Sequence, residues 1–238
     1  MNEGAEPARR FYKSATAEEA AGGFTIALDE RTLKTPGGTT FRVPTRALAE
    51  ACAGEWREQT THIIPARMPI TQLAFAAIDW TAKDRGARIA YVAGFGETDL
   101  CCHRAESPAP LVARQAARWD RLVEWGALKL GAKLSVVTGI IAAPVSPGAL
   151  AALRSQAAAL DDYALTALSQ AAGLSGSALI AFALLLGELD AQGGFEAAAL
   201  DELWSLECWG EDAEARARLR RIRAEFDALA GFIARLAA

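Results

Sequence analysis

The sequence has few of the residues that usually carry metal or thiol chemistry. Four cysteines and two histidines occur among 238 residues. The cysteines lack the paired C-x-x-C spacing of zinc sites, and four thiols in a chain of this size do not make a disulfide framework. Such cysteine usage is typical of a reducing compartment. We therefore expect a cytoplasmic protein without a bound metal or cofactor.

The sequence also lacks a segment that favours membrane insertion. The longest apolar run, SALIAFALLLGEL, contains Gly187 and Glu188 and falls well short of the roughly 20 residues that cross a bilayer. The first residues, MNEGAEPARRFYKSATAEEAAGG, show no signal peptide and are too acidic for an organelle transit peptide. We expect the apolar run to form a buried core helix.

An excess of positive charge is missing as well. The net charge of -4 gives no global attraction for phosphate backbones or anionic lipids, so nucleic acid is not an expected partner. The glycine-rich pieces TPGGTT and GFGETD lack the G-K-[ST] and the third glycine of nucleotide sites. We expect no nucleotide requirement, and the sequence has no repeat of fixed period.

The first 44 residues have β character. GFTIALD alternates apolar and polar residues with period two, and the short β-rich runs RTLKTP and GGTTFRVP follow. Turn residues separate these three runs. They predict a small antiparallel sheet that must lean on a helix for stability.

After Pro44 the spacing becomes helical. PTRALAEACAGEWREQ places Leu48, Cys52 and Trp56 on one helix face, with Thr45 as N-cap. From residue 108 on, alanine-rich segments predict five or six packed helices. We expect an α+β multidomain chain with a small antiparallel β domain at 1–44, connecting helices at 45–107 and an all-α domain at 108–238.

The stretch ETDLCCHRAESP contains two of the four cysteines and one of the two histidines. Adjacent Cys101 and Cys102 would point to opposite sides of an extended segment, and a zinc ion needs about four ligands. A nucleophilic cysteine would need a base and an oxyanion hole, whereas a free cysteine is usually a small buried hydrophobe. A cysteine- or metal-dependent enzyme centred on residues 97–104 remains the alternative hypothesis.

Tryptophan and acidic residues form a more informative pattern. Trp204 and Trp209 lie in LDELWSLECWGEDAE, where no basic residue occurs from 201 to 215. Such aromatic residues are usually core and such acids are usually a solvated face, but together they can form a recognition patch for a basic, partly apolar partner. The combination recurs at Glu55, Trp56 and Glu58.

The order of the sequence blocks resembles one protein family, the assembly chaperones for the α subunit of F-type ATP synthase. The resemblance extends from Arg10 to Phe226. It is carried by nine blocks in the family's order and spacing, namely RFYK, LDERTLKTPGG, GEWREQ, IIPARMPITQLAFAAID, GETDLCCHRA, LVARQAARWDRLVEW, GSALIAFALLLGEL, DELWSLECWGED and EF. The expected absence of a transit peptide points to a bacterial member.

The resemblance implies a non-catalytic chaperone that binds the unassembled α subunit and shields its subunit interface from aggregation until the β subunit replaces it. It attaches importance to Trp56 and to acids of the late W-G-acidic block. Together with their neighbours in the two tryptophan and acid patches, the predicted partner-binding residues are Glu55, Trp56, Glu202, Glu207, Trp209, Glu211 and Asp212.

The chain departs from the family's usual pattern after ETDL, where leucine and tyrosine are common and this sequence has Cys101 and His103. The departure argues against thiol or imidazole chemistry at these positions. We expect the charged residues of this block, Glu97, Asp99 and Arg104, to tie the β domain to the helices.

Overall fold

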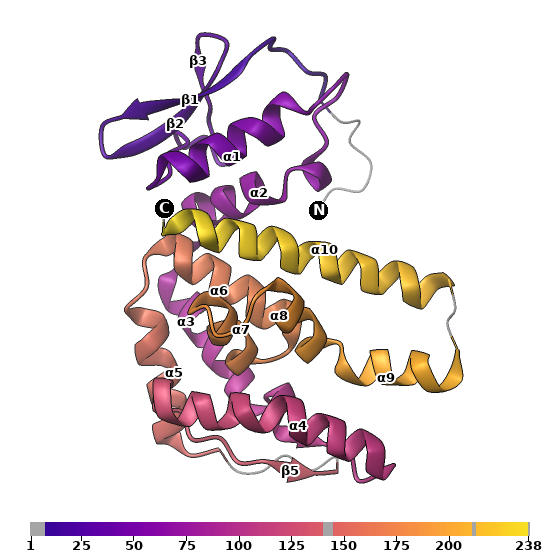
Figure 1. Cartoon of the computed structure of the whole chain (residues 1–238). Coiled ribbons are helices and arrows are strands. Elements are labelled where there is room, and N and C mark those ends of the chain that lie inside the picture. Colours follow the sequence, from indigo (N-terminus) through magenta and orange to yellow (C-terminus); the bar gives the residue numbers. More distant parts are fainter. Residues whose placement is uncertain (1–7, 140–144, 211–212, 238) are drawn as a thin grey trace. The chain divides into compact units, whose positions relative to one another are not determined.

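A computed structural model describes residues 8–139, 145–210 and 213–237. The chain forms two compact units, one made of the residues up to Lys83 with those from Gly231 on, and one made of Asp84–Ala230. The first contains a three-stranded antiparallel sheet, and the second is mainly helical (Figure 1). The expected fold class, a small β domain followed by a larger helical one, is confirmed.

The strands and longer helices follow in chain order. They are β1 (Ala15–Ala20), β2 (Gly23–Leu28), β3 (Arg31–Thr32), α1 (Arg46–Arg57), α2 (Pro69–Ala76), α3 (Arg85–Gly94), β4 (His103–Arg104), α4 (Ala109–Trp125), β5 (Val137–Thr138), α5 (Pro147–Ala158), α6 (Asp162–Ser175), α7 (Ala178–Leu185), α8 (Ala191–Ala198), α9 (Leu200–Trp209) and α10 (Ala213–Leu236).

The sheet of the first unit differs from the predicted one in its strands. It has the order β1-β2-β3, and the sequence analysis did not predict β1, whose sequence ATAEEA has low β propensity. The expected strand at 37–44 contributes isolated bridges instead, from Val43 to Phe24 and from Thr40 to Lys34. Antiparallel pairing of β1 with the apolar β2 determines its conformation.

Helix α1 packs against β1 and β2, as the predicted apolar face requires. Leu48, Cys52 and Trp56 are buried, and the Thr45 side chain accepts a hydrogen bond from the Leu48 amide as an N-cap. Helices α1 and α2 therefore belong to the same compact unit as the sheet. The boundaries between the units follow Lys83 and Ala230, whereas the predicted domain boundaries follow residues 44 and 107.

The TPGG turn is held by a buried carboxylate. Asp79 accepts hydrogen bonds from the Thr35 hydroxyl and the Gly37 amide, both at 2.8 Å. A Cβ atom at residue 37 would lie 2.4 Å from Asp79 Oδ1, so glycine is required for this close approach. The motif fixes a turn of the small domain, in agreement with its prediction as a turn and not a phosphate site.

The second unit is built around α7, in which all residues from Ala178 to Leu184 are buried. Helices α4, α6 and α8 pack against it. Trp119 of α4 is also buried and donates an Nε1 hydrogen bond of 2.9 Å to the carbonyl of Ala197. This bond ties α4 to α8.

Seven helices, α4 to α10, follow residue 108 in the described part of the chain, where five or six were expected. The additional helix arises at residues 193–210. The structure separates α8 from α9 at Ala199. This break allows α9 to pack against α4 as well as α8.

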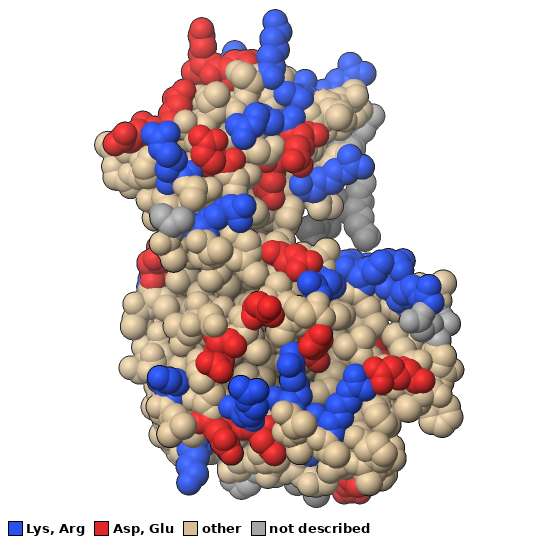
Figure 2. Space-filling model, viewed as in Figure 1, with Lys and Arg blue, Asp and Glu red and all other residues tan. Residues whose placement is uncertain are grey.

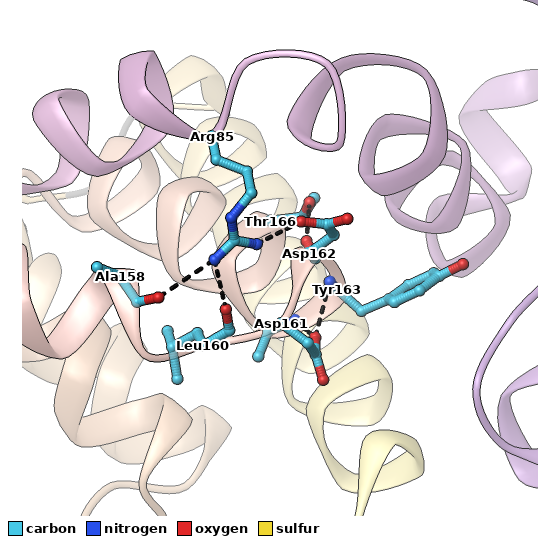
Figure 3. A network of polar contacts seen from close by, with 8 residues as sticks. Arg85, Ala158, Leu160, Asp161, Asp162, Tyr163 and Thr166 are labelled. Carbon is cyan, nitrogen blue, oxygen red and sulfur yellow. Dashed lines mark hydrogen bonds and ion pairs between the residues drawn. The ribbon is translucent and has the colours of Figure 1, made fainter.

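Arg85 joins the start of α3 to the turn between α5 and α6 (Figure 3). Its guanidinium group donates hydrogen bonds to the carbonyls of Leu160 at 2.7 Å and Ala158 at 3.3 Å, and it forms an ion pair with Asp162. In the same turn, the Asp161 side chain caps α6 by accepting hydrogen bonds from the amides of Tyr163 and Ala164. The turn is therefore held by polar contacts from three helices.

Asp99 of the ETDL block joins the chain before β4 to the N-terminus of α7. Its carboxylate is buried and accepts hydrogen bonds from the Ser177 hydroxyl at 2.6 Å, the Cys101 amide at 3.0 Å and the Leu179 amide at 3.1 Å. The expectation that Asp99 ties the β domain to the helices is wrong, because all these partners lie within the second unit.

Arg104 also acts within the second unit, where it forms an ion pair of 2.9 Å with Asp120 of α4. Its side chain is buried, and the guanidinium group lies 5.4 Å from the ring centroid of Trp119. The expectation that Arg104 ties the β domain to the helices is therefore wrong as well. These contacts hold the segment after ETDL against α4.

Substitution of Asp99 by alanine is expected to lower the free energy of unfolding by about 3 kcal/mol, because it leaves a buried hydroxyl and two amides without their acceptor. Urea titration followed by circular dichroism measures the change. The control Glu188→Ala, at an exposed position of the same unit, is expected to stay within about 0.5 kcal/mol of the parent. Equal stability of Asp99→Ala and the control would contradict the assigned role.

Candidate functional site

A groove on the second unit lies between α4, α8 and α9. It has a volume of about 490 Å³ and combines charged and polar side chains with an apolar lining. The apolar residues are Ala117, Phe195, Leu200 and Leu203. A second hollow of the same volume adjoins it, sharing Ala117 and Arg118 and extending to the turn before α8. The two hollows follow α4 along its exposed side.

Ion pairs bridge the groove. Arg114 binds both carboxylate oxygens of Glu207, at 2.5 and 2.8 Å, and Arg118 contacts Glu196 at 3.1 Å and the carbonyl of Gly193 at 2.8 Å. The hydrogen bond from Arg114 lowers the pKa of Glu207 and raises that of Arg114. Acidic and basic side chains accordingly alternate over this face (Figure 2).

Three acidic side chains of α9 have hydrogen-bond or ion-pair partners within the protein. Glu202 pairs with Arg218 of α10, Glu207 pairs with Arg114 of α4, and Asp201 accepts a 2.7 Å hydrogen bond from the Gln115 amide group. The expectation of uncompensated carboxylates is therefore wrong at these positions. Their partners lie outside residues 201–215, so the absence of basic residues within that stretch did not indicate that the acids are unpaired.

The two tryptophans of α9 differ in environment. Trp204 is half-buried, with the Arg114 guanidinium 5.8 Å from its ring centroid. Trp209 ends the helix with 87% of its surface exposed. An aromatic side chain exposed to this extent has few contacts in the free protein and is available to a partner. Glu211 and Asp212, also predicted to bind a partner, lie outside the described residues.

Glu55 and Trp56 belong to the first unit and have internal partners there. Glu55 accepts hydrogen bonds from the amides of Ile70 at 2.8 Å and Thr71 at 2.7 Å, so its carboxylate caps the N-terminus of α2. Burial raises the pKa of Glu55. The carboxylate therefore acts within the unit as a connection between α1 and α2.

Trp56 is 6% exposed, its ring lies 5.6 Å from that of Tyr12, and its carbonyl accepts a 2.7 Å hydrogen bond from the Tyr12 hydroxyl. Its own Nε1 donor is buried and has no hydrogen-bond partner among the described residues. These contacts give Trp56 a role in the core of the small domain. Little of the Trp56 side chain is therefore accessible to a partner protein.

The sequence analysis did not identify Arg114 and Arg118. Both lie on α4, four residues apart, at the edge of the stripe of buried residues Gln115, Trp119 and Leu122. This spacing is a detectable signal for a basic helix face. Phe195 carried no comparable signal, because its position in the groove depends on how α8 packs.

The cysteines of the ETDLCCHRA block do not have the environment of nucleophiles. Cys101 and Cys102 are buried, and burial raises the pKa of Cys102 to about 12 and that of Cys101 well above its ordinary value. Nearby Asp99 raises both further. A thiol must lose its proton to attack or to bind a metal, so these values oppose the alternative enzyme hypothesis.

The neighbourhood of His103 gives that hypothesis no further support. In β4 it pairs with Val137 of β5 in a short parallel ladder. Within the residues that the structure describes, no three histidine, cysteine or acidic side chains are grouped to hold a metal ion. In the same described part, no helix has the length and apolar character to span a membrane.

An apolar groove with a charged rim, on a unit that also exposes a tryptophan, has the composition of a surface that binds another protein. The comparisons with known proteins agree with this class. Residues 9–127 match the model of the family described as ATP12 chaperone protein. The chain belongs to this family, so the resemblance to an assembly chaperone of ATP synthase is confirmed.

Individual relatives cover most of the chain. The protein described as "Protein atp12, mitochondrial" of Schizosaccharomyces pombe is 30% identical, with 86% of this chain and 75% of that protein covered. The crystal structure of Atp12 from Paracoccus denitrificans has a TM-score of 0.90 and 38% identity, over 96% of this chain and 98% of that one. A solved structure from Agrobacterium tumefaciens has a TM-score of 0.89 and 37% identity, over 96% and 86%.

Thiol titration of the native protein tests the environment of the cysteines. We expect Cys208, which is exposed, to react rapidly with an aromatic disulfide reagent at neutral pH. Cys52, Cys101 and Cys102 are buried and should react only after denaturation. The variant Cys208→Ser, which should show almost no fast reaction, is the control. Rapid reaction of Cys102 in the folded protein would restore the enzyme hypothesis.

Proposed function

We propose that the protein is a non-catalytic chaperone that binds the unassembled α subunit of the F-type ATP synthase. It shields the α-subunit surface that the β subunit later occupies, and it needs neither nucleotide nor cofactor. Membership of the ATP12 chaperone family supports the general role. The observation that carries the proposal for this chain is the groove lined in part by α9, the helix that also carries the exposed Trp209.

The groove has the properties that a temporary contact requires. Phe195, Leu200 and Leu203 offer apolar surface, and an unassembled subunit exposes an apolar patch that must be covered to prevent aggregation. Ion pairs between exposed side chains are worth only about 0–1 kcal/mol. Charged groups of the client can therefore replace Arg114 as the partner of Glu207 at small cost.

The predicted contact residues take two roles in this proposal. Trp209, Glu202 and Glu207 contact the client directly from α9. Glu55 and Trp56 support binding from within the small domain, because a cap and a buried ring maintain its fold. Glu211 and Asp212, which follow Trp209 in the sequence, complete the acidic part of the contact.

Release follows from competition for the same surface. The β subunit displaces the chaperone when it binds the α subunit, so no chemical step is required. The structural relatives from two bacteria support a bacterial protein, and we place its action in the cytoplasm.

Dilution of denatured α subunit into buffer tests the function. With an equimolar amount of this protein and no ATP, light scattering from aggregated α subunit should fall to a small fraction of its value without chaperone. An unrelated acidic protein of similar size is the control. If scattering is unchanged and the two proteins do not co-purify after co-expression, the proposed function is wrong.

Trp209→Ala tests where the client binds. We expect binding to the α subunit to weaken by about tenfold or more, as for other exposed tryptophans that anchor an interface, with an unchanged circular dichroism spectrum. Trp80→Ala is the matched control, because Trp80 is 64% exposed but lies in the first unit. Isothermal titration gives both affinities; equal losses for the two variants would contradict a contact centred on α9.

A further inference from the structure

The beginning of α10 carries a concentration of positive charge that contrasts with the net charge of the chain. Between Ala213 and Arg223 there are five arginines and one acidic residue, Glu214. Leu219 is the one buried residue of this stretch, all of which the structure describes. Figure 2 shows the basic side chains gathered over this part of the helix. The five are Arg216, Arg218, Arg220, Arg221 and Arg223.

Pairing within the protein neutralises part of this charge. Arg218 forms an ion pair with Glu202, and Arg223 pairs with Asp227 at 3.1 Å, one turn along the helix. Arg220 and Arg221 are exposed and have no ion pair with any residue of the described chain. Their hydrogen-bond donors are therefore available to a partner.

The arrangement of the arginines is unfavourable for an isolated helix. Arg216 and Arg220 are four residues apart, and Arg218 and Arg221 are three apart, so like charges lie side by side on the helix surface. A partner that brings carboxylates to this stretch would relieve the repulsion.

Trp209 provides an exposed apolar group shortly before these arginines in the chain. Four peptide links separate it from Ala213, so the α carbons can be no more than about 14 Å apart. Arg218 also pairs with Glu202, which brings α10 alongside α9. Arg220 lies about 10 Å further along α10, so its α carbon is within about 25 Å of that of Trp209, a span that about eight extended residues of a partner cover.

We propose that this surface, formed by Trp209, Arg220 and Arg221, binds an acidic and partly apolar segment of the client protein. Carboxylates suit it because guanidinium groups bind them in a bidentate manner. Nucleic acid suits it less well, since the chain is acidic overall and Glu225 and Asp227 follow directly on the same helix. Only the identity of the client rests on the proposed function; the chemistry of the segment does not.

Charge reversal tests the proposal with a matched control. In Arg220→Glu/Arg221→Glu the two free guanidinium groups become carboxylates, whereas Arg31→Glu/Arg154→Glu makes the same change of charge at exposed positions elsewhere. The probes are purified α subunit, two 15-residue peptides with identical leucine positions carrying either glutamate or lysine, and a short DNA duplex. Fluorescence anisotropy at low and moderate salt gives each affinity.

The glutamate peptide should bind the parent protein more tightly than the lysine peptide or the DNA, and its affinity should fall about tenfold in the Arg220/Arg221 variant. The control variant should stay within about twofold. Binding of the α subunit should weaken in the same order. Tighter binding of DNA, a preference for the lysine peptide, or equal affinities of the two variants for the glutamate peptide would each overturn the proposal.

The two proposals fail in different ways. If the parent protein does not bind the α subunit but binds the glutamate peptide through Arg220 and Arg221, the proposed function is wrong and the surface chemistry stands. If the α subunit binds both variants equally well, the α10 surface is not a client contact and the inference is wrong, while the proposed function stands.

Discussion

A buried carboxylate at the start of a buried helix determines how the second unit is arranged. Asp99 binds the Ser177 hydroxyl and the Leu179 amide, and α7 then runs through the core with all residues from Ala178 to Leu184 buried. A buried carboxylate is stable only when its hydrogen bonds are satisfied, which fixes the position of α7. Helices α4 and α8 pack on α7, so the groove between them and α9 depends on this contact.

The surface that this framework presents contains both paired and unpaired charges. Glu202 and Glu207 have arginine partners from other helices, whereas Arg220 and Arg221 of α10 have no ion pair within the described residues. Exposed ion pairs contribute little stability. A charged group of the client can therefore replace one partner of such a pair on binding, and the internal pair can form again on release. A chaperone must release its client, and a contact made of one exposed aromatic anchor and exchangeable charges fits that requirement.

The features that could be predicted from the sequence are those determined by residues close to one another in the chain. The buried face of α1 and its N-cap at Thr45 follow from neighbouring residues, and the structure confirms both. Strand β1 was missed because its alanines and glutamates have low β propensity and its pairing with β2 determines its state. The groove was missed for a similar reason. Its rim pairs Arg114 with Glu207, about ninety positions away. Trp56 lies on the predicted buried face of α1, but its contact with Tyr12, 44 positions away, has no local sequence signal.

The central claim is that α9 and the beginning of α10 contact the client. Site-specific photo-crosslinking in cells that produce both proteins tests it most directly, with a photoreactive side chain introduced in place of Trp209, Arg220 or, for comparison, the exposed Arg154 of α5. The account predicts adducts with the α subunit from the first two positions and none above background from the third. Adducts from position 154 with none from 209 or 220 would contradict it.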